Sequence, residues 1–343
     1  MPALLTRIYR RLVRSRDPWR HLLASVSARA LEYDPALDDE AKRALFKKNV
    51  TLVELEPHAY CNRTCSFCPN STLDRLTVKS HLDLSVYERI LHDLRSIDYR
   101  HVLRFARYSE PMAHDHIYEM VATARRYLPG SEIDIVTNGD YLNPRALGRL
   151  REAGLSVLRI SVYMRRGVTW SVEAAREEIA RLGKRIEIDP AWDAATATTV
   201  GAGFAYRGLH IVAFSHDFDE IGYDRGQLLE GLMDRDYVRR SPCFLVFSNF
   251  TVDFNGKVMP CCNLRSDHPQ HVPFVLGDLS NRPESIFDVY ASQRFTDWRR
   301  GLVTVGEKGD PCRTCKQKVL EGPALLEIGR AIDTKLRRVG VRL

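Results

Sequence analysis

The chain has 343 residues, of which 44% are hydrophobic and 28% charged, which is ordinary for a soluble globular protein with one large domain and a smaller one. Its net charge of +7 is concentrated in residues 1–30, which contain seven arginines and one aspartate, so the rest is nearly neutral and is not a basic nucleic-acid-binding surface. No run approaches the roughly 18 apolar residues of a membrane span, and no signal peptide is evident. We therefore expect a cytoplasmic protein, whose eight cysteines serve as metal ligands or catalytic groups rather than disulfides.

The N-terminal segment reads as an amphipathic helix. Its apolar residues recur at helical spacing, with arginines on the other face: Leu4, Leu5, Ile8, Tyr9, Leu12 and Val13. One interpretation is a helix packed on the outside of the main domain; the other is contact with a membrane surface or an anionic partner. Residues 36–49 predict a second short helix.

Residues 50–215 alternate between strand and helix patterns. Apolar, β-rich runs occur at 51–55, 101–105, 132–136, 157–162, 185–188 and 209–214, and helical patterns lie at 83–96, 116–127, 144–153 and 171–182. Such alternation predicts an α/β fold with a parallel sheet covered by helices. Six units predict a partial (β/α)6 TIM-like barrel, with chemistry at the C-terminal ends of its strands.

The pattern changes after the last of these strands. Residues 190–208 are rich in Ala, Thr and Gly and predict a loop, whereas 244–250 and 257–259 predict two short strands around a turn at 253–256. Residues 323–339 predict a final helix. We expect an N-terminal helical extension (1–49), the partial barrel (50–235), a small α+β domain (236–320) and a C-terminal helix (321–343).

The strongest motif follows the first predicted strand. Cys61, Cys65 and Cys68 form C-x₃-C-x₂-C, with Phe67 before the last cysteine. Three thiolates are too few for structural zinc, which takes four ligands. They suit a cubane iron–sulfur cluster with one open iron, which can bind a substrate or cofactor.

The other five cysteines all follow residue 240. Cys243, Cys261, Cys312 and Cys315 could close around a metal, and their spacing permits either a zinc ribbon or a second iron–sulfur cluster. The first motif favours iron–sulfur. Cys262 is a fifth thiol that could be an alternative ligand, a small core residue or a hydrogen-atom donor.

Together these motifs resemble the radical SAM superfamily, whose members cleave S-adenosylmethionine (SAM). The resemblance implies that Cys61, Cys65 and Cys68 hold a [4Fe–4S] cluster that chelates SAM. After the second strand, Tyr108-Ser109-Glu110-Pro111 matches the family's usual Gly-Gly-Glu-Pro only in Glu110 and Pro111. By the same resemblance, these four residues, Asn138 after strand three and Ser161 on strand four bind SAM.

The C-terminal cysteines resemble the family's twitch or SPASM-type domain, which implies an auxiliary [4Fe–4S] cluster on Cys243, Cys261, Cys312 and Cys315. The resemblance also implies an electron donor such as flavodoxin or ferredoxin. We expect a 5′-deoxyadenosyl radical to take a hydrogen atom from a sugar, aminocyclitol or nucleoside in antibiotic or other specialised-metabolite biosynthesis.

The sequence leaves the outcome of that reaction open. A fully ligated auxiliary cluster favours oxidation of a carbinol carbon, whereas a hydrogen atom returned by Cys262 would give epimerisation. The alternatives are carbon–carbon coupling on a nucleoside or sugar, modification of a ribosomally made peptide, and, outside enzymes, a zinc-binding module.

Overall fold

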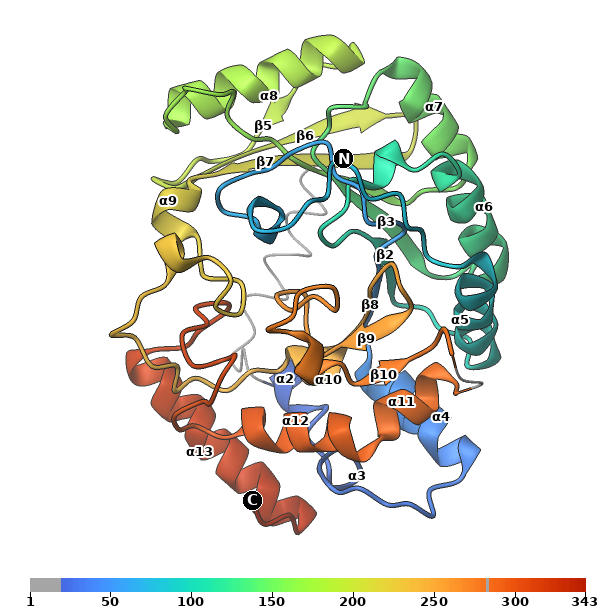
Figure 1. Cartoon of the computed structure of the whole chain (residues 1–343), viewed down its shortest axis with the longest axis vertical. Helices are drawn as coiled ribbons and strands as arrows, with labels where there is room; N and C mark the ends of the chain where they lie inside the picture. Colours follow the sequence, from blue (N-terminus) through green and yellow to red (C-terminus); the bar gives the residue numbers. More distant parts are fainter. Residues whose placement is uncertain (1–19, 282–283) are drawn as a thin grey trace.

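The structure, a computed structural model, describes residues 20–281 and 284–343 (Figure 1). The predicted helix over residues 4–13, and with it the question of membrane contact, lies outside the described residues. The chain enters through α2 (Arg20–Leu23), α3 (Ala28–Leu31) and α4 (Asp39–Asn49). Helix α4 confirms the helix predicted over 36–49.

A ten-stranded sheet organises the molecule. Its six central strands are parallel, in the spatial order β8 (Asn249–Val252), β1 (Leu52–Leu55), β2 (Val102–Phe105), β3 (Glu132–Thr137), β4 (Val157–Ser161) and β7 (Leu209–His216). Antiparallel strands extend both edges: β6 (Thr199–Tyr206) and β5 (Ala191–Trp192) beyond β7, and β9 (Lys257–Met259) and β10 (Gly277–Asp278) beyond β8. The predicted α/β fold with a partial barrel is confirmed.

The helices that cover the barrel strands begin where the sequence predicts. They are α5 (Leu84–Ser96), α6 (Ile117–Tyr127), α7 (Pro144–Glu152) and α8 (Val172–Ile186), on the outer side of the sheet in Figure 1. The side chains of Asp83, Asn143 and Ser171 accept hydrogen bonds from the first turns of α5, α7 and α8. Such caps satisfy backbone donors that a helix leaves free at its start.

Three local predictions are wrong. The strand predicted over 244–250 is mostly a short helix, Leu245–Ser248, and the strand there begins only at Asn249. Residues 185–188 do not form a strand, because α8 continues to Ile186 and Glu187 ends it in the left-handed conformation. Residues 190–208 are not an irregular loop, because they contain β5 and β6, and β6 pairs with β7 along eight residues. The barrel therefore ends in a β-hairpin rather than in a further βα unit.

The C-terminal part continues the barrel sheet. β8 lies parallel to β1 in the register Leu52↔Asn249, and short helices α10 (Leu245–Ser248) and α11 (Ile286–Ala291), followed by α12 (Gln293–Val303) and α13 (Gly322–Val339), complete this part. The ring of Phe46 on α4 lies 5.3–5.4 Å from those of Phe250, Phe287 and Tyr290. One hydrophobic core thus joins the N-terminal helices, the sheet and the C-terminal helices.

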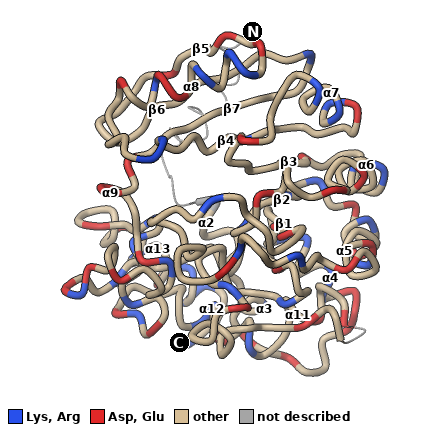
Figure 2. Tube along the Cα trace, turned by 45° about the horizontal axis from the view of Figure 1, so that its top comes forward, with Lys and Arg blue, Asp and Glu red and all other residues tan. Residues whose placement is uncertain are grey.

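Charged residues of both signs are distributed over this fold. Figure 2 shows Lys and Arg interspersed with Asp and Glu along the described chain. Among the described helices, none is long and apolar enough to cross a membrane.

Candidate active site

The first three cysteines lie on the loop that follows β1. Burial, and to a smaller extent the neighbouring thiols, raise the pKa of Cys61 to about 11 and that of Cys65 to about 12. All three side chains are partly buried in this loop. A bound metal would deprotonate such thiols outright, so raised thiol pKa values do not prevent ligation.

The number and type of the ligands distinguish a cluster from a zinc ion. Within residues 20–281 and 284–343, no three His, Cys, Asp or Glu side chains converge on a position for a single metal ion. Structural zinc takes four ligands in a closed site, whereas three thiolates on one loop suit a cubane cluster with one open iron.

Glu110 anchors the loop after β2 to the loop after β3. Its carboxylate accepts hydrogen bonds from the Thr137 hydroxyl (2.5 Å) and from the backbone N–H groups of Asn138 (2.7 Å) and Met112 (3.0 Å). Burial raises the pKa of Glu110 to about 7, although these donors lower it. Glu110 and Asn138, both predicted to bind SAM, are thus brought together at one end of the sheet.

The cysteine loop is tied to the same place. Arg63 makes a two-point ion pair with Asp140 at 2.6 and 2.7 Å, and the Asn62 amide donates to Asp140 at 2.8 Å. The Asn138 amide donates in turn to the Asn62 side-chain oxygen at 2.7 Å. Bidentate Arg–carboxylate pairs fix orientation as well as distance. The loops after β1 and β3 therefore form one rigid platform.

Aromatic rings flank the cysteine loop on its other side. Phe67 stacks on Phe218 with ring centroids 3.9 Å apart, and Tyr163 lies 5.2 Å from Phe67. Tyr163 follows Ser161, the last residue of β4, and Phe218 begins α9 (Phe218–Ile221). Two other residues predicted to bind SAM make contacts within the loop after β2. Ser109 donates to the Ala106 carbonyl, and Pro111 begins a single 3₁₀ turn.

The four later cysteines form a second group. Cys243 precedes α10, Cys261 follows β9, and Cys312 and Cys315 lie between α12 and α13. Burial raises the pKa of Cys261, Cys312 and Cys315, and thiol neighbours within the group raise each further. The Cys243 N–H donates to the Leu302 carbonyl at 2.8 Å, which holds the first ligand against α12. Four such thiols fit a fully ligated cluster.

Cys262 lies between the two cysteine groups. After burial, the groups that act on its thiol are Glu54 on β1 and the guanidinium groups of Arg107 and Arg225. Its sulfur is 3.8 Å from the Gln317 side-chain oxygen. The thiol of Cys262 thus contacts the segment after Cys315 and is within electrostatic reach of β1.

Arg225 lies where the barrel meets the C-terminal part, and no sequence motif predicted a role for it. Its Nη1 donates to the Tyr223 hydroxyl (2.9 Å) and to the Asn263 side-chain oxygen (3.2 Å). The Gln317 side-chain oxygen accepts from the same two residues, at 2.9 and 2.5 Å. Asn263 follows Cys261 by two residues and Gln317 follows Cys315 by two. The auxiliary ligand loops therefore orient the guanidinium.

The surroundings of Arg225 connect the two groups of cysteines. Burial lowers the pKa of its guanidinium, but Tyr223, Tyr108, Cys262 and Cys68 raise it by more. Among the described residues, no carboxylate lies within the 4.0 Å of an ion pair with Arg225. A half-buried cation without a carboxylate is available to a ligand oxygen.

Buried ion pairs hold the auxiliary part against the barrel. Arg75, which follows the cysteine loop, lies 3.1 Å from Glu56 and 3.0 Å from Asp267 of the C-terminal part, and it donates to the Ala59 carbonyl at 2.6 Å. Breaking a buried pair typically costs 3–5 kcal/mol, because one charge is left uncompensated. These pairs fix the position of one cysteine group relative to the other.

A second buried pair lies beside Tyr108. Arg107 contacts Asp253 at 2.5 Å and donates to the Cys261 carbonyl at 3.3 Å. The ring of Tyr108 lies between the guanidinium groups of Arg107 and Arg265, 5.2 and 4.9 Å from its centroid. Its hydroxyl is buried and has no hydrogen-bond partner among the residues that the structure describes. Tyr108, predicted to bind SAM, therefore lies at the contact with the auxiliary part.

A cluster of histidines lies behind Glu110. The rings of His58 and His114 are buried with centroids 5.1 Å apart, and His81 lies 5.8 and 4.9 Å from them. His58 Nε2 donates to the Glu110 carbonyl at 2.8 Å. Burial, together with the neighbouring histidines, lowers the pKa of His58 and of His114 to about 4. Both rings are neutral at neutral pH.

We expect these histidines to make the protein acid-labile. Below its pKa of about 6.5 the unfolded chain binds protons at both positions, while the folded protein remains neutral until about pH 4. The stabilisation is therefore complete above pH 6.5 and is lost as the pH falls toward 4, by up to about 3 kcal/mol for each histidine. The melting temperatures at pH 7.5 and 5.5 measure the effect.

A matched pair of variants tests the cause. His114→Phe should reduce the decrease in melting temperature between pH 7.5 and 5.5. His92→Phe should leave it unchanged, since His92 is exposed and contacts only Tyr127 among the aromatic side chains described. An equal decrease in the wild type and both variants would exclude the buried histidines as the cause.

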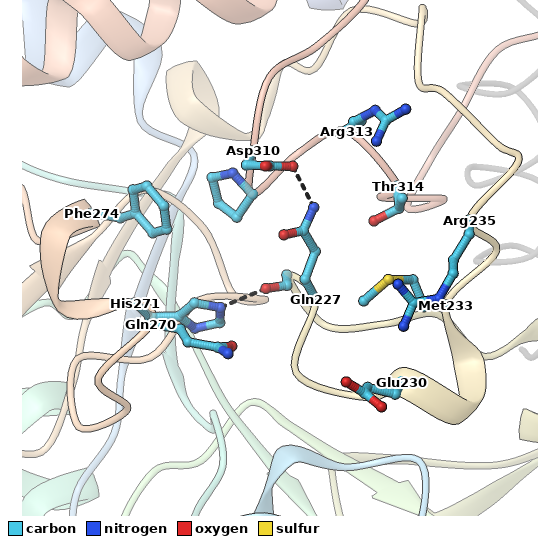
Figure 3. Close-up of a pocket in the computed structure, with 12 residues that line it drawn as sticks. Gln227, Glu230, Met233, Arg235, Gln270, His271, Phe274, Asp310, Arg313 and Thr314 are labelled. Atoms are coloured by element: carbon cyan, nitrogen blue, oxygen red, sulfur yellow. Dashed lines mark hydrogen bonds between the residues drawn. The ribbon is translucent and has the colours of Figure 1, made fainter.

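A separate pocket of about 440 Å³ lies beside the Arg225 loop (Figure 3). It is lined by Gly226 and Gln227 on one side and by Pro311, Arg313 and Thr314 around Cys312 on another. The His271 ring contacts the Gly226 carbonyl at 2.7 Å, and Gln227 donates to Asp310 at 2.5 Å. Neither Arg225 nor Cys262 lines this pocket, so it is distinct from the candidate active site.

Comparisons with known proteins agree with this geometry. The sequence model of the radical SAM superfamily matches residues 55–194, and that of an iron–sulfur cluster-binding domain, SPASM, matches residues 243–316. Together the two matches cover more than half of the chain. They contain all the cysteines of both groups.

Similar proteins include a SAM-dependent 2-deoxy-scyllo-inosamine dehydrogenase from Niallia circulans, 24% identical over 270 residues that cover 78% of this chain and 93% of the relative. The crystal structure of BtrN in complex with AdoMet and 2-DOIA is 21% identical, with a TM-score of 0.52 over 74% of this chain and 87% of BtrN. Streptococcus suis SuiB bound to SAM is 13% identical, with a TM-score of 0.43 over 79% of this chain and 74% of SuiB.

The fold, the two groups of cysteines and the two sequence matches lead to the same conclusion. The two matched families indicate a [4Fe–4S] cluster with SAM and an auxiliary cluster, and the three-cysteine and four-cysteine groups are suited to hold them. The chain is therefore an enzyme of the radical SAM superfamily with a C-terminal auxiliary iron–sulfur cluster domain.

Proposed function

We propose that this enzyme oxidises a carbinol carbon of a small carbohydrate-like substrate, an aminocyclitol or a sugar, to a ketone. The observation that supports this most strongly is the pairing of one three-cysteine site with one four-cysteine site across a shared sheet. Four thiolates leave no iron open for substrate, so the auxiliary cluster suits electron acceptance. The dehydrogenase of Niallia circulans, named for the aminocyclitol 2-deoxy-scyllo-inosamine, provides independent support.

The site divides the chemistry between cofactor and protein. When bound at Cys61, Cys65 and Cys68, the cluster and SAM supply a 5′-deoxyadenosyl radical. We propose that Glu110, Asn138, Ser161, Ser109 and Pro111 line the SAM site, because the hydrogen bonds of Glu110 and Asn138 fix the loops there.

The substrate is expected to lie between the two cysteine groups, where Arg225, Tyr108 and Cys262 meet. Arg225 would donate to the oxygen of the carbinol, and the buried, unpaired Tyr108 hydroxyl offers a second polar contact. Loss of a hydrogen atom, a proton and an electron converts the carbinol to a ketone. The guanidinium near that oxygen favours departure of its proton, because it stabilises the alkoxide form.

Epimerisation is the second candidate, and the position of Cys262 is the observation that favours it. Its thiol belongs to neither predicted ligand set and contacts Gln317, which helps to orient Arg225, so it could return a hydrogen atom to the substrate radical. No observation favours carbon–carbon coupling or a peptide substrate.

We expect Cys262→Ala to retain ketone formation within about threefold, because a dehydrogenase needs no hydrogen donor and removing one small group changes packing by only about 1 kcal/mol. Cys262→Ser is the matched control, since it preserves the volume of the side chain. Product analysis by mass spectrometry and NMR measures the effect. Complete loss of an inverted product in Cys262→Ala, with SAM cleavage retained, would instead assign epimerisation.

The direct test uses 2-deoxy-scyllo-inosamine as the probe, with the reconstituted enzyme, SAM and dithionite under anaerobic conditions. Oxidation predicts one ketone per 5′-deoxyadenosine, and deuterium at the reacting carbon should appear in 5′-deoxyadenosine. SAM cleavage without a ketone from this probe or from related aminocyclitols and sugars would contradict the proposal.

The reaction also needs a source of electrons. We propose flavodoxin or ferredoxin as the donor, because SAM cleavage requires one low-potential electron that the chain itself does not carry. The reducing cytoplasm is the compartment in which eight free cysteines and such carriers coexist.

A further inference from the structure

Arg239 is a buried cation in contact with an auxiliary ligand. Its side chain is 1% exposed, and its Nη1 lies 3.6 Å from the Cys315 sulfur. The other guanidinium contacts are backbone carbonyls of residues 241, 242, 315 and 317, at 2.8–3.1 Å. Arg239 is therefore fixed with one N–H group directed at the cluster ligand.

Lys308 is a second buried cation on the same group of cysteines. It is 5% exposed, and its ammonium donates to the carbonyls of Thr304 (2.7 Å) and Gly301 (3.3 Å) at the end of α12. Cys243 and Cys312 are near enough to act on it electrostatically, as is Arg239. The Lys308 backbone N–H donates to the Arg239 carbonyl at 3.0 Å, so the segments that carry the two cations are paired beside Cys315.

Neither cation has a carboxylate partner. Throughout the described part of the chain, no Asp or Glu oxygen lies within 4.0 Å of either charge. The buried carboxylate of Asp224 accepts a hydrogen bond from the Thr314 hydroxyl, and its negative charge raises the pKa of Cys315. Buried charges require compensation, and beside Arg239 the Cys315 thiolate of a loaded cluster site would supply it.

We propose that Arg239 and Lys308 raise the reduction potential of the auxiliary cluster, so that it accepts an electron from the oxidised substrate, an inference that rests on the dehydrogenase function proposed above. Cluster potentials depend on net charge, burial and hydrogen bonds to the sulfurs. Reduction adds one negative charge at this site, and two fixed cations favour the reduced form. A weak N–H···S bond from Asn263 to Cys315 (4.0 Å) acts in the same direction.

The proposed step balances. The substrate carbinol transfers one hydrogen atom to the 5′-deoxyadenosyl radical, giving 5′-deoxyadenosine and a carbon radical. That radical loses its hydroxyl proton to solvent and one electron to the auxiliary cluster, and the carbon–oxygen single bond becomes a double bond. An electron-carrier protein of the flavodoxin or ferredoxin class then reoxidises the cluster.

The test is a redox titration of the full-length enzyme with both clusters, followed by electron paramagnetic resonance. The auxiliary signal is identified by comparison with a Cys61→Ala, Cys65→Ala, Cys68→Ala variant. We expect Lys308→Gln and Arg239→Gln each to lower the auxiliary potential enough to change the electron-transfer equilibrium about tenfold, or about 59 mV for one electron. Asp224→Asn should raise it.

Lys316→Gln is the matched control, because Lys316 is adjacent to Cys315 in sequence but exposed and paired with Asp234 at 2.7 Å. The auxiliary-cluster potential of Lys316→Gln should stay near that of the wild type. Lys308→Gln and Asp224→Asn keep the test decisive if Arg239→Gln does not fold. Unchanged potentials in these variants, with a full complement of auxiliary iron, would overturn the proposal.

The titration needs no substrate, so the two proposals can fail separately. Shifted potentials without ketone formation would leave the role of Arg239 and Lys308 intact and remove the dehydrogenase function. Ketone formation with unshifted potentials would leave the dehydrogenase function intact and exclude the role of Arg239 and Lys308.

Discussion

Cys65→Ala is expected to abolish SAM cleavage, lowering 5′-deoxyadenosine formation by at least about 10³-fold, because the radical comes from the cofactor and not from the protein. Cys312→Ala is expected to keep SAM cleavage within about tenfold while ketone formation falls below detection, because only the electron acceptor is removed. The measurement is simultaneous quantification of 5′-deoxyadenosine and ketone by liquid chromatography.

Iron content provides the control for this pair of variants. Two cubane clusters require about eight irons per chain, so each variant should retain about four. Cys262→Ala should retain about eight, since Cys262 belongs to neither predicted ligand set. Ketone formation at the wild-type rate by Cys312→Ala would show that the auxiliary cluster is not the electron acceptor.

The parallel strands and their helices were predictable because local signals agreed with the tertiary fold. Asn143-Pro144 begins α7, and Asp83 caps α5, as the sequence indicates. At 185–188 the apolar residues fit both the two-residue spacing of a strand and the spacing of a helix. Ile186 alternates with Ile188 as in a strand, but it also continues the series Ile179 and Leu182 on the buried face of α8, and packing follows the helical series.

Strand β6 was missed because its composition hides the period-2 signal. Gly201 and Gly203 alternate with buried Val200, Ala202 and Phe204, and glycine usually argues against a strand. A Cβ at Gly201 would lie 3.2 Å from the Phe214 ring on β7 and 3.1 Å from Asp193. A side chain at position 201 would crowd Phe214 and Asp193, so the position favours glycine. This constraint comes from the partner strand and cannot be read from the local sequence.

The same distinction applies to the candidate site. Both groups of cysteines were visible because cluster ligands share one residue type and lie on short, recognisable loops. Arg225 and Gln317 were not visible, because an arginine or glutamine in a loop has no diagnostic spacing. Their roles arise only when the C-terminal strands pair with β1 and bring the auxiliary loops to the barrel.

Arg225→Met is expected to lower kcat/KM for ketone formation by about 10- to 100-fold, because a hydrogen bond to a charged group contributes about 1.5–3 kcal/mol. SAM cleavage without substrate should be unchanged, since the first cluster and its platform do not include Arg225. The loss should appear as a higher KM if Arg225 only binds the carbinol, and as a lower kcat if it also assists loss of the proton.

Two further variants separate a role for Arg225 from a general disturbance of the junction. Arg165→Met should have no effect, because Arg165 is more than half exposed and pairs with Glu178 on α8. Tyr223→Phe removes one hydroxyl that orients the guanidinium and should give a smaller loss than Arg225→Met. If Arg225→Met formed ketone as fast as Arg165→Met, the substrate oxygen would have to be recognised elsewhere, and the buried Tyr108 hydroxyl would be the next group to replace.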